Sequence, residues 1–197
     1  MTVALIASAA LGMGLLGGCS SSCKTRTIEC GTEPIQCETA PMGMAEPLAG
    51  YDDVKNVSRM GGLTFAGQPT EAALARYAAE GGTMVIDLRT HQGSDGANFD
   101  EAATVAELGM AYVHIPMSAA TMSTEDVKRF AEALREAKGP VMVHCGSSNR
   151  VGGLWAAFVA LEKGCPTEKA IEKGKAAGMR SASVEEAARR VIAEGGE

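Results

Sequence analysis

The sequence predicts an α/β protein in which a central, mostly parallel sheet is flanked by helices. Short apolar runs rich in β-branched residues recur between residues 63 and 143, and segments with helical spacing alternate with them. This order is typical of βαβ units, whose strands run parallel. Apolar residues make up 46% of the chain but aromatic residues only 4%. We therefore expect a core built mainly from Val, Leu, Ile, Ala and Met.

Four runs are expected to form buried strands because they are short, apolar and bounded by turn residues. They are residues 63–66, 83–86, 111–115 and 141–143. Gly67-Gln68-Pro69 ends the first run, and Pro116 ends the third.

Six segments carry apolar residues at helical spacing. They are residues 71–80, 99–108, 125–137, 150–163, 167–177 and 184–194. Thr70 is a favourable N-cap for the first helix. Ser123 followed by Asp126 resembles a capping box for the third.

Residues 1–18 resemble a lipoprotein-type signal peptide. Residues 3–16 carry no charge, and a stretch of this length suits a signal better than a membrane span, which needs about 20 residues. Leu16-Gly17-Gly18-Cys19 resembles a bacterial lipobox, although Met1-Thr2 lacks the usual basic residue. We expect lipidation at Cys19 and export, with a lipid anchor in a bacterial membrane facing the periplasm or exterior. The alternative is an unprocessed tail.

Residues 19–51 are expected to form a flexible tether, and residues 52–197 the catalytic domain. The tether is rich in Ser, Thr, Gly, Glu and Pro and shows no regular period. Cys23, Cys30 and Cys37 lie in it without zinc-site spacing. A disulfide suits an oxidising compartment, but the sequence leaves the pairing open.

The charge balance excludes a nucleic-acid partner. The chain has 18 Lys and Arg against 24 Asp and Glu, a net charge of −6, and no basic run. We find no metal motif and no dinucleotide or Walker-type glycine loop, so we expect no metal and no cofactor.

The stretch from Val141 to Arg150 carries the predicted chemistry. A buried strand delivers Cys145 to the end of the sheet where α/β proteins build their sites. The loop Gly146-Ser147-Ser148-Asn149 then leads into a helix. Its N–H groups bind an anion and favour a thiolate at Cys145, and Arg150 chelates two anion oxygens. We expect Cys145 to be the nucleophile and Arg150 the anion clamp.

Two other features lie outside this stretch. Asp87 and Arg89 end a strand at the same edge, and we expect them to support the loop rather than to catalyse. Cys165 lies between Gly164 and Pro166 without an activating context, so we expect a structural or incidental role.

Four sequence blocks together resemble a known family. They are Phe65-Ala66-Gly67-Gln68-Pro69-Thr70, Val85-Ile86-Asp87-Leu88-Arg89, Tyr112-Val113-His114-Ile115-Pro116 and the Cys145 loop. The set is similar to the phosphatase-like domain of the beta-lactamase-hydrolase-like family, which is related to dual-specificity and tyrosine phosphatases. The resemblance covers roughly residues 57–180. It implies that Cys145 is the nucleophile, Arg150 binds the anion and His144 supports the loop and the thiolate.

Three departures from the phosphatase pattern keep other functions open. Four residues separate Cys145 from Arg150, whereas most tyrosine phosphatases have five. Val151 replaces the usual Ser or Thr after the Arg. Residues 117–122 contain no Asp to act as general acid. Asp95 and Asp100 lie in an earlier loop, and Asp126 has the sequence context of a helix start.

The favoured function is hydrolysis of a phosphomonoester through a Cys145 thiophosphate, with a small molecule or phosphoprotein as substrate. The first alternative is sulfur transfer through a Cys145 persulfide, which needs no Asp acid. The second is a catalytically weak module that binds phosphorylated ligands.

Overall fold

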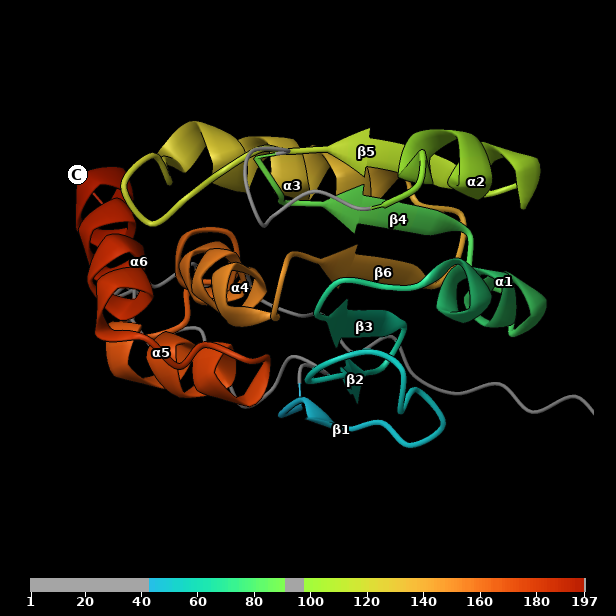
Figure 1. The fold of residues 1–197 in the computed structure, drawn as a ribbon. Helices are drawn as coiled ribbons and strands as arrows, with labels where there is room; N and C mark the ends of the chain where they lie inside the picture. The colour runs from blue at the N-terminus through green and yellow to red at the C-terminus, as the bar shows by residue number, and fades with distance from the viewer. Residues whose placement is uncertain (1–42, 91–97, 197) are drawn as a thin grey trace, which may run out of the picture. The chain divides into compact units, whose positions relative to one another are not determined.

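The computed structural model describes residues 43–90 and 98–196. Six strands form one sheet in these ranges, with helices packed around it (Figure 1). The strands are β1 (Glu46–Pro47), β2 (Ser58–Met60), β3 (Leu63–Ala66), β4 (Met84–Asp87), β5 (Ala111–His114) and β6 (Val141–His144). The helices are α1 (Glu71–Ala79), α2 (Glu101–Glu107), α3 (Thr124–Glu136), α4 (Asn149–Leu161), α5 (Thr167–Ala176) and α6 (Ala182–Gly195). The predicted fold class is therefore confirmed.

The strand order is β1-β2-β3-β6-β4-β5. The last four strands in this order run parallel, and β6 lies between β3 and β4. In this register His144, at the end of β6, lies opposite both Ala66 and Asp87. The carboxyl ends of the central strands therefore meet beside Cys145.

Strands β1 and β2, which were not predicted, add an antiparallel edge to the sheet. They span two and three residues, which is too short for a period of two to be visible. Glu46–Pro47 falls inside the segment assigned to the tether, and Tyr51 at its end is buried. Regular structure thus begins before the predicted start of the domain at residue 52.

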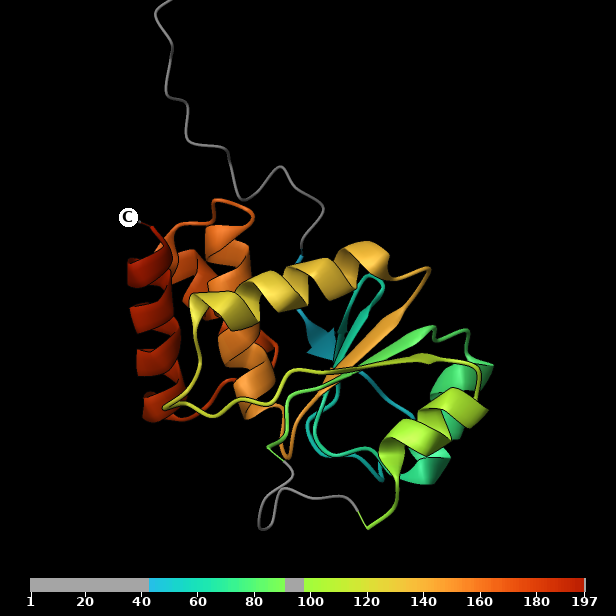
Figure 2. The ribbon, with the colours of Figure 1, turned by 90° about the horizontal axis from the view of Figure 1, so that it is seen from above.

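Helices cover both faces of the sheet, with α1 and α2 on one side and α3 to α6 on the other (Figure 2). Successive strand residues alternate between the two faces. Ala66, Val85 and Met142 pack with Leu74 of α1. Phe65, Ile86 and Val143 pack in the second, larger core.

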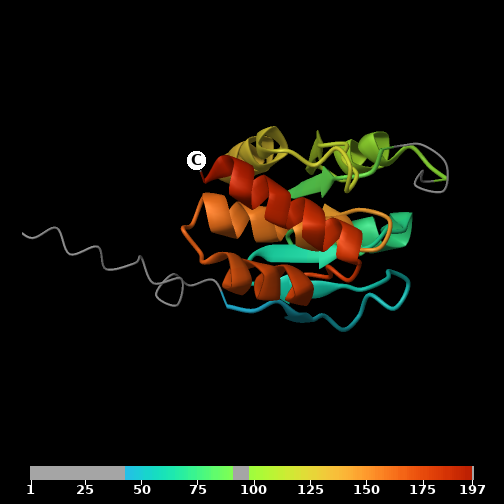
Figure 3. The same ribbon diagram turned by 90° about the vertical axis from the view of Figure 1, so that its left-hand side faces the viewer.

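Helix α4 is enclosed by other elements, which explains its continuous apolar sequence. Its residues from Val151 to Val159 are all buried. Helices α5 and α6 cover the side of α4 that faces away from the sheet (Figure 3). Trp155 of α4 is a core residue, since it is 2% exposed and packs against Phe65 and Phe158.

Several predicted features lie outside the described residues: the signal peptide, Cys19, Cys23, Cys30, Cys37 and Asp95. Within the two described ranges, no helix is both long enough and apolar enough to cross a bilayer.

Candidate active site

Cys145 is the first residue of the loop that joins β6 to α4. It is a free thiol and 1% exposed. Its N–H donates to the carbonyl of Ala66 on the neighbouring strand at 3.3 Å, which continues the β6 ladder by one residue. Ser148 has φ 66° and ψ −4°, a left-handed conformation. This turn lets the chain pass from strand to helix within a few residues.

Neighbouring elements hold the loop through its carbonyl groups. The Gly146 carbonyl accepts from the N–H of Gln68 at 3.4 Å. The Ser147 carbonyl accepts from the side-chain amide of Asn56 at 3.1 Å and from the guanidinium of Arg180. In the described part of the chain, the N–H groups of Gly146 and Ser147 have no acceptor. Together with the first N–H groups of α4, which have no intrahelical acceptor, they form an anion-binding arrangement.

The side chains of Ser148 and Asn149 serve the scaffold. Ser148 is buried and its hydroxyl donates to the carbonyl of Ala177 at 2.9 Å. The Asn149 side-chain oxygen accepts from the N–H groups of Arg180 and Ser181 at 2.7 and 3.1 Å. The predicted cradle therefore consists of backbone groups at these two positions, and the side chains tie the loop to the segment before α6.

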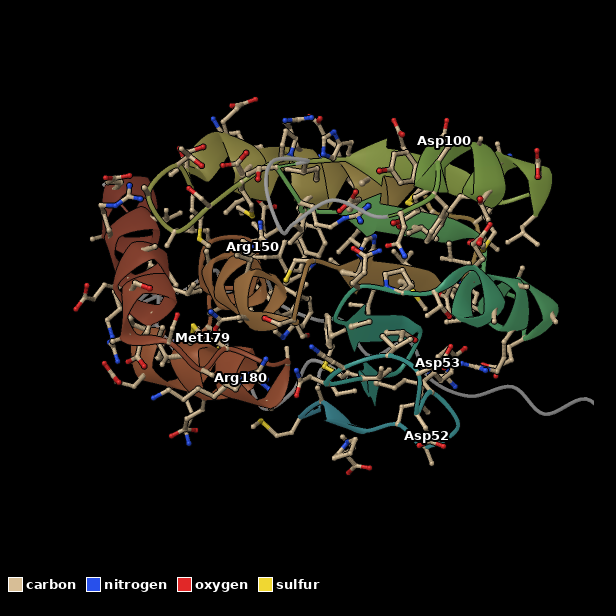
Figure 4. All side chains as sticks on the ribbon, viewed as in Figure 1. Asp52, Asp53, Asp100, Arg150, Met179 and Arg180 are labelled. Atoms are coloured by element: carbon tan, nitrogen blue, oxygen red, sulfur yellow. The ribbon has the colours of Figure 1, made fainter. Side chains whose placement is uncertain are left out.

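Arg150 lies at the carboxyl end of the sheet. Its Nη1 donates to the carbonyls of Met117 and Leu88 at 3.1 and 3.4 Å. These residues follow β5 and β4, so the guanidinium lies on the side of α4 that faces these strands (Figure 4). The predicted nucleophile and the predicted clamp thus lie at the same end of the sheet, Cys145 directly after β6 and Arg150 in the first turn of α4.

Asp87 and Arg89 form a buried ion pair beside the loop. The Asp87 carboxylate accepts from Arg89 Nε at 2.9 Å and from Arg89 Nη2 at 2.7 Å, and both side chains are fully buried. Burial alone would raise the pKa of Asp87, but the hydrogen bonds from Arg89 and the nearby His144 hold it well below its usual range. Their predicted role in supporting the loop stays a prediction.

Three further residues, which were not predicted as site residues, complete this network. Glu101 accepts from Arg89 Nη2 at 2.5 Å, and the Gln68 side chain accepts from Arg89 Nη1. The Tyr112 hydroxyl donates to Asp87 at 2.8 Å, and burial together with this bond raises the pKa of Tyr112. Gln68 and Tyr112 lie in the blocks that carry the family resemblance, which is a usable signal. No sequence signal marked Glu101, because acidic residues are common in the first turn of a helix.

His144 connects this network to the nucleophile. It precedes Cys145 directly and is fully buried. Its Nε2 lies 2.6 Å from Glu101 Oε1 and 3.7 Å from Asp87 Oδ1. Neither Glu101 Oε1 nor the two imidazole nitrogens have a hydrogen-bond partner within the described residues. The supporting role of His144 therefore stays a prediction, based on its packing against the two carboxylates.

Asp87, Glu101 and His144 have the donor types of a metal site, and their donor atoms lie within 4.8 Å of one another. Arg89, however, already forms ion pairs with both carboxylates, at 2.7 and 2.5 Å. A divalent cation would have to displace or face this guanidinium. Because Arg89 already pairs with both carboxylates, the group fits a structural support better than a metal centre.

The acidic side chains considered as general acids have structural roles where they are described. Asp126 forms the predicted capping box with Ser123, which is confirmed. Asp100 is the N-cap of α2 and accepts from the N–H of Ala103 at 3.0 Å. The loop 117–122 carries no carboxylate.

Cys165 differs from Cys145 in its chemical state, because it is disulfide-bonded. The only other cysteine in the described ranges is Cys145, which is free. The disulfide agrees with the expected structural role of Cys165.

Comparisons with known proteins show the family of the chain. Residues 39–162 match the family described as "Beta-lactamase hydrolase-like protein, phosphatase-like domain". A relative from Agrobacterium fabrum, a beta-lactamase hydrolase-like protein, is 33% identical over 102 residues, which cover 51% of this chain and 24% of the relative. A protein of the same description from Xylella fastidiosa is 29% identical over 96 residues, covering 48% and 22%. The chain thus matches about a quarter of the length of these curated relatives.

Solved structures share the fold. The crystal structure of P. aeruginosa TpbA has a TM-score of 0.60 at 19% identity and covers 77% of this chain and 89% of its own. A Cys-to-Ser variant of TpbA, crystallised with phosphotyrosine, has a TM-score of 0.58 at 18% identity, covering 76% and 88%. Tk-PTP in its active form has a TM-score of 0.55 at 18% identity, covering 66% and 91%.

Proposed function

Because the chain belongs to the phosphatase-like domain family of beta-lactamase hydrolase-like proteins, we propose that it is a cysteine-dependent phosphatase. One observation carries the proposal: the free Cys145 lies at the start of a strand-to-helix loop whose N–H groups and Arg150 suit a tetrahedral anion. The proposed substrate is a phosphomonoester, on a small molecule or a phosphoprotein. TpbA, which shares the fold, has been crystallised with phosphotyrosine.

The proposed reaction has two steps. The Cys145 thiolate attacks phosphorus, an S–P bond forms, and the P–O ester bond breaks to release the alcohol or phenol. Water then attacks the cysteinyl phosphate, the S–P bond breaks, and inorganic phosphate and the thiolate are released. Arg150 and the loop amides stabilise the charge on the phosphoryl oxygens in both transition states.

The leaving group must receive a proton unless it is a stable anion. No carboxylate lies in the loop 117–122, and Asp95 lies outside the described residues. The loss of a general acid costs roughly 10²–10⁴-fold in rate. Aryl phosphates, whose phenolate products are stable, should therefore be hydrolysed far faster than alkyl phosphates.

The first test is hydrolysis of p-nitrophenyl phosphate by the purified chain and by its Cys145→Ser variant. We expect turnover in the parent and none in the variant. Equal background rates in both would refute the phosphatase proposal. Circular dichroism of both proteins verifies that the variant is folded.

Sulfur transfer is the second candidate, favoured by the four-residue loop and by the missing carboxylate. In this reaction Cys145 breaks the S–S bond of thiosulfate and releases sulfite. The resulting persulfide then gives its outer sulfur to cyanide, forming thiocyanate. Cys145-dependent thiocyanate formation without phosphate release would support this candidate over the first.

We further propose that the phosphatase is exported and anchored to a bacterial membrane through lipid at Cys19. The support is the lipobox-like sequence at residues 16–19 and the disulfide at Cys165, a bond that persists in oxidising compartments. Metabolic labelling with a fatty-acid analogue should mark the chain and should fail to mark a Cys19→Ala variant. Labelling of both would refute the anchor site.

A further inference from the structure

We propose that Arg180 determines substrate specificity by binding a second anionic group, a phosphate or a carboxylate, next to the phosphate in the Cys145 loop. The nature of the first group rests on the proposed function. The second group follows from the placement of Arg180.

Arg180 is fixed to the Cys145 loop at two points. Its guanidinium donates from Nη2 to the carbonyl of Ser147, two residues after the nucleophile. Its backbone N–H donates to the side-chain oxygen of Asn149 at 2.7 Å. The cation is therefore held at the rim of the loop.

Most hydrogen-bonding capacity of this guanidinium is unused. A guanidinium has five N–H donors, and in the described part of the chain the Ser147 carbonyl is its one acceptor. Arg180 is exposed and has no carboxylate partner within the described residues. Other arginines do pair with carboxylates at 3.4 Å or less: Arg59, Arg76, Arg189 and Arg190. The planar fork of Arg180 is thus available for a phosphate or carboxylate.

Holding the loop does not account for a cation at this position. The Ser147 carbonyl also accepts from the Asn56 side-chain amide at 3.1 Å, and Asn149 already links the loop to Ser181. These neutral groups supply the anchoring that Arg180 would duplicate. The loop itself contributes only Gly, Ser and Asn side chains before Arg150, so Arg180 adds charge that the loop lacks.

The two arginines lie on different sides of α4. Arg150 is on the side facing β4 and β5, and Arg180 is on the side facing α5 (Figure 4). Arg180 also lies beyond the family match, which ends at residue 162. A preference for a second anionic group would therefore be a property that the C-terminal helices of this chain add to the phosphatase-like core.

The inference is tested first by binding, without turnover. Two full-length proteins are compared by calorimetric titration: the Cys145→Ser variant and the double variant that also carries Arg180→Ala. Each is titrated with inorganic phosphate and, separately, with pyrophosphate. We expect Arg180→Ala to weaken pyrophosphate binding about tenfold more than it weakens phosphate binding, the effect of one lost charge-assisted hydrogen bond. Arg135→Ala is the matched control. Arg135 is an exposed arginine at the end of α3, near the start of β6 and therefore at the end of this strand away from Cys145. This substitution should change the affinity for neither anion.

Each other outcome has a definite meaning. If Arg180→Ala weakens the binding of both anions equally, Arg180 only positions the loop. If neither affinity changes, Arg180 does not contact either anion. Either result overturns the inference. If neither anion binds even with Arg180 present, the anion-binding loop of the proposed function fails, and the inference with it.

Turnover then identifies the source of the second group. With Cys145 intact, we compare a sugar bisphosphate with its monophosphate, and a phosphotyrosine peptide flanked by Glu with one flanked by Gln. In one of the two pairs, Arg180→Ala should raise the KM of the more highly charged substrate, the bisphosphate or the Glu-flanked peptide, more than the KM of its partner. The pair that shows this difference identifies the second group as a phosphate or as a carboxylate. An equal change in KM across both pairs would contradict a specificity role.

Discussion

At the scale of single residues, the site depends on the shape of the Arg150 guanidinium as well as its charge. Nη1 bonds the carbonyls of Met117 and Leu88, which fixes the plane of the group. Lysine would keep the charge but would lose this fork. We expect Arg150→Lys to lower kcat/KM for p-nitrophenyl phosphate by about 10²–10³-fold, as for the loss of an oxyanion donor. Steady-state kinetics measures this, and a loss below about threefold would contradict the clamp role.

The Asp87 carboxylate makes stability depend on pH. Its folded-state pKa is held below the usual range, so its contribution is complete above the unfolded value near 4 and is lost as pH falls below it. Asp87→Asn leaves Arg89 buried with one carboxylate fewer, and we expect a loss of about 3–5 kcal/mol at pH 7. Urea unfolding from pH 7 to pH 3 should also show a shallower acid decline in the variant.

Asp53→Asn is the matched control for this prediction. Asp53 pairs with Arg76 at 2.6 Å, but both side chains are 36% exposed. An exposed pair contributes at most about 1 kcal/mol. Similar losses of unfolding free energy in the two variants would show that the buried ion pair stabilises the protein no more than the exposed pair does.

The sequence identified residues whose chemistry depends on local context and missed those placed by tertiary contacts. Cys145 and Arg150 stand in one stretch, so their spacing revealed them. Glu101 reaches Arg89 from the start of another helix, and nothing near it in the chain indicates this contact. Arg180 reaches the loop across 33 residues, which no sequence period could predict.

At the scale of elements, the Cys145 loop depends on close packing of α4 against α5. A Cβ on Gly152 would lie 2.3 Å from both the Gly174 carbonyl oxygen and the Met179 backbone nitrogen. Both atoms belong to backbone and cannot rotate away. We expect Gly152→Ala to cost about 1–3 kcal/mol or more, measured by urea unfolding, and to lower activity because Gly152 lies in the first turn of α4.

Gly62→Ala is the control for this prediction. A Cβ on Gly62 meets nothing within 4 Å, so its effect should stay within about 1 kcal/mol. A cost for Gly152→Ala as small as this would mean that α5 shifts easily and that the packing is loose.

Among the elements, those with a long period or a strong boundary were predictable. The four parallel strands and the helices match their predicted segments to within about two residues. The pairing of β1 with β2 was not predictable. Two strands this short are stabilised by pairing with the neighbouring β3 and not by their own sequence.

At the scale of the whole molecule, the two cysteines of the described core differ in chemical state. Cys165 is 4% exposed and disulfide-bonded, while Cys145 is free. After denaturation without reductant, iodoacetamide should therefore modify Cys145 and leave Cys165 unmodified, as peptide mass spectrometry would show. Modification of Cys165 under these conditions would contradict the disulfide.

The disulfide also predicts a redox-dependent stability. Reduction removes a constraint on the unfolded chain, which typically costs about 2–4 kcal/mol, so dithiothreitol should lower the free energy of unfolding by this amount. A Cys165→Ser variant should start at the lower value and should not respond to dithiothreitol. Because Cys145 is a free thiol in either condition, Cys145→Ser should respond as the parent does. A parent protein whose stability ignores dithiothreitol would show that the bond contributes nothing to the fold, leaving the sheet and its helices to hold the Cys145 loop alone.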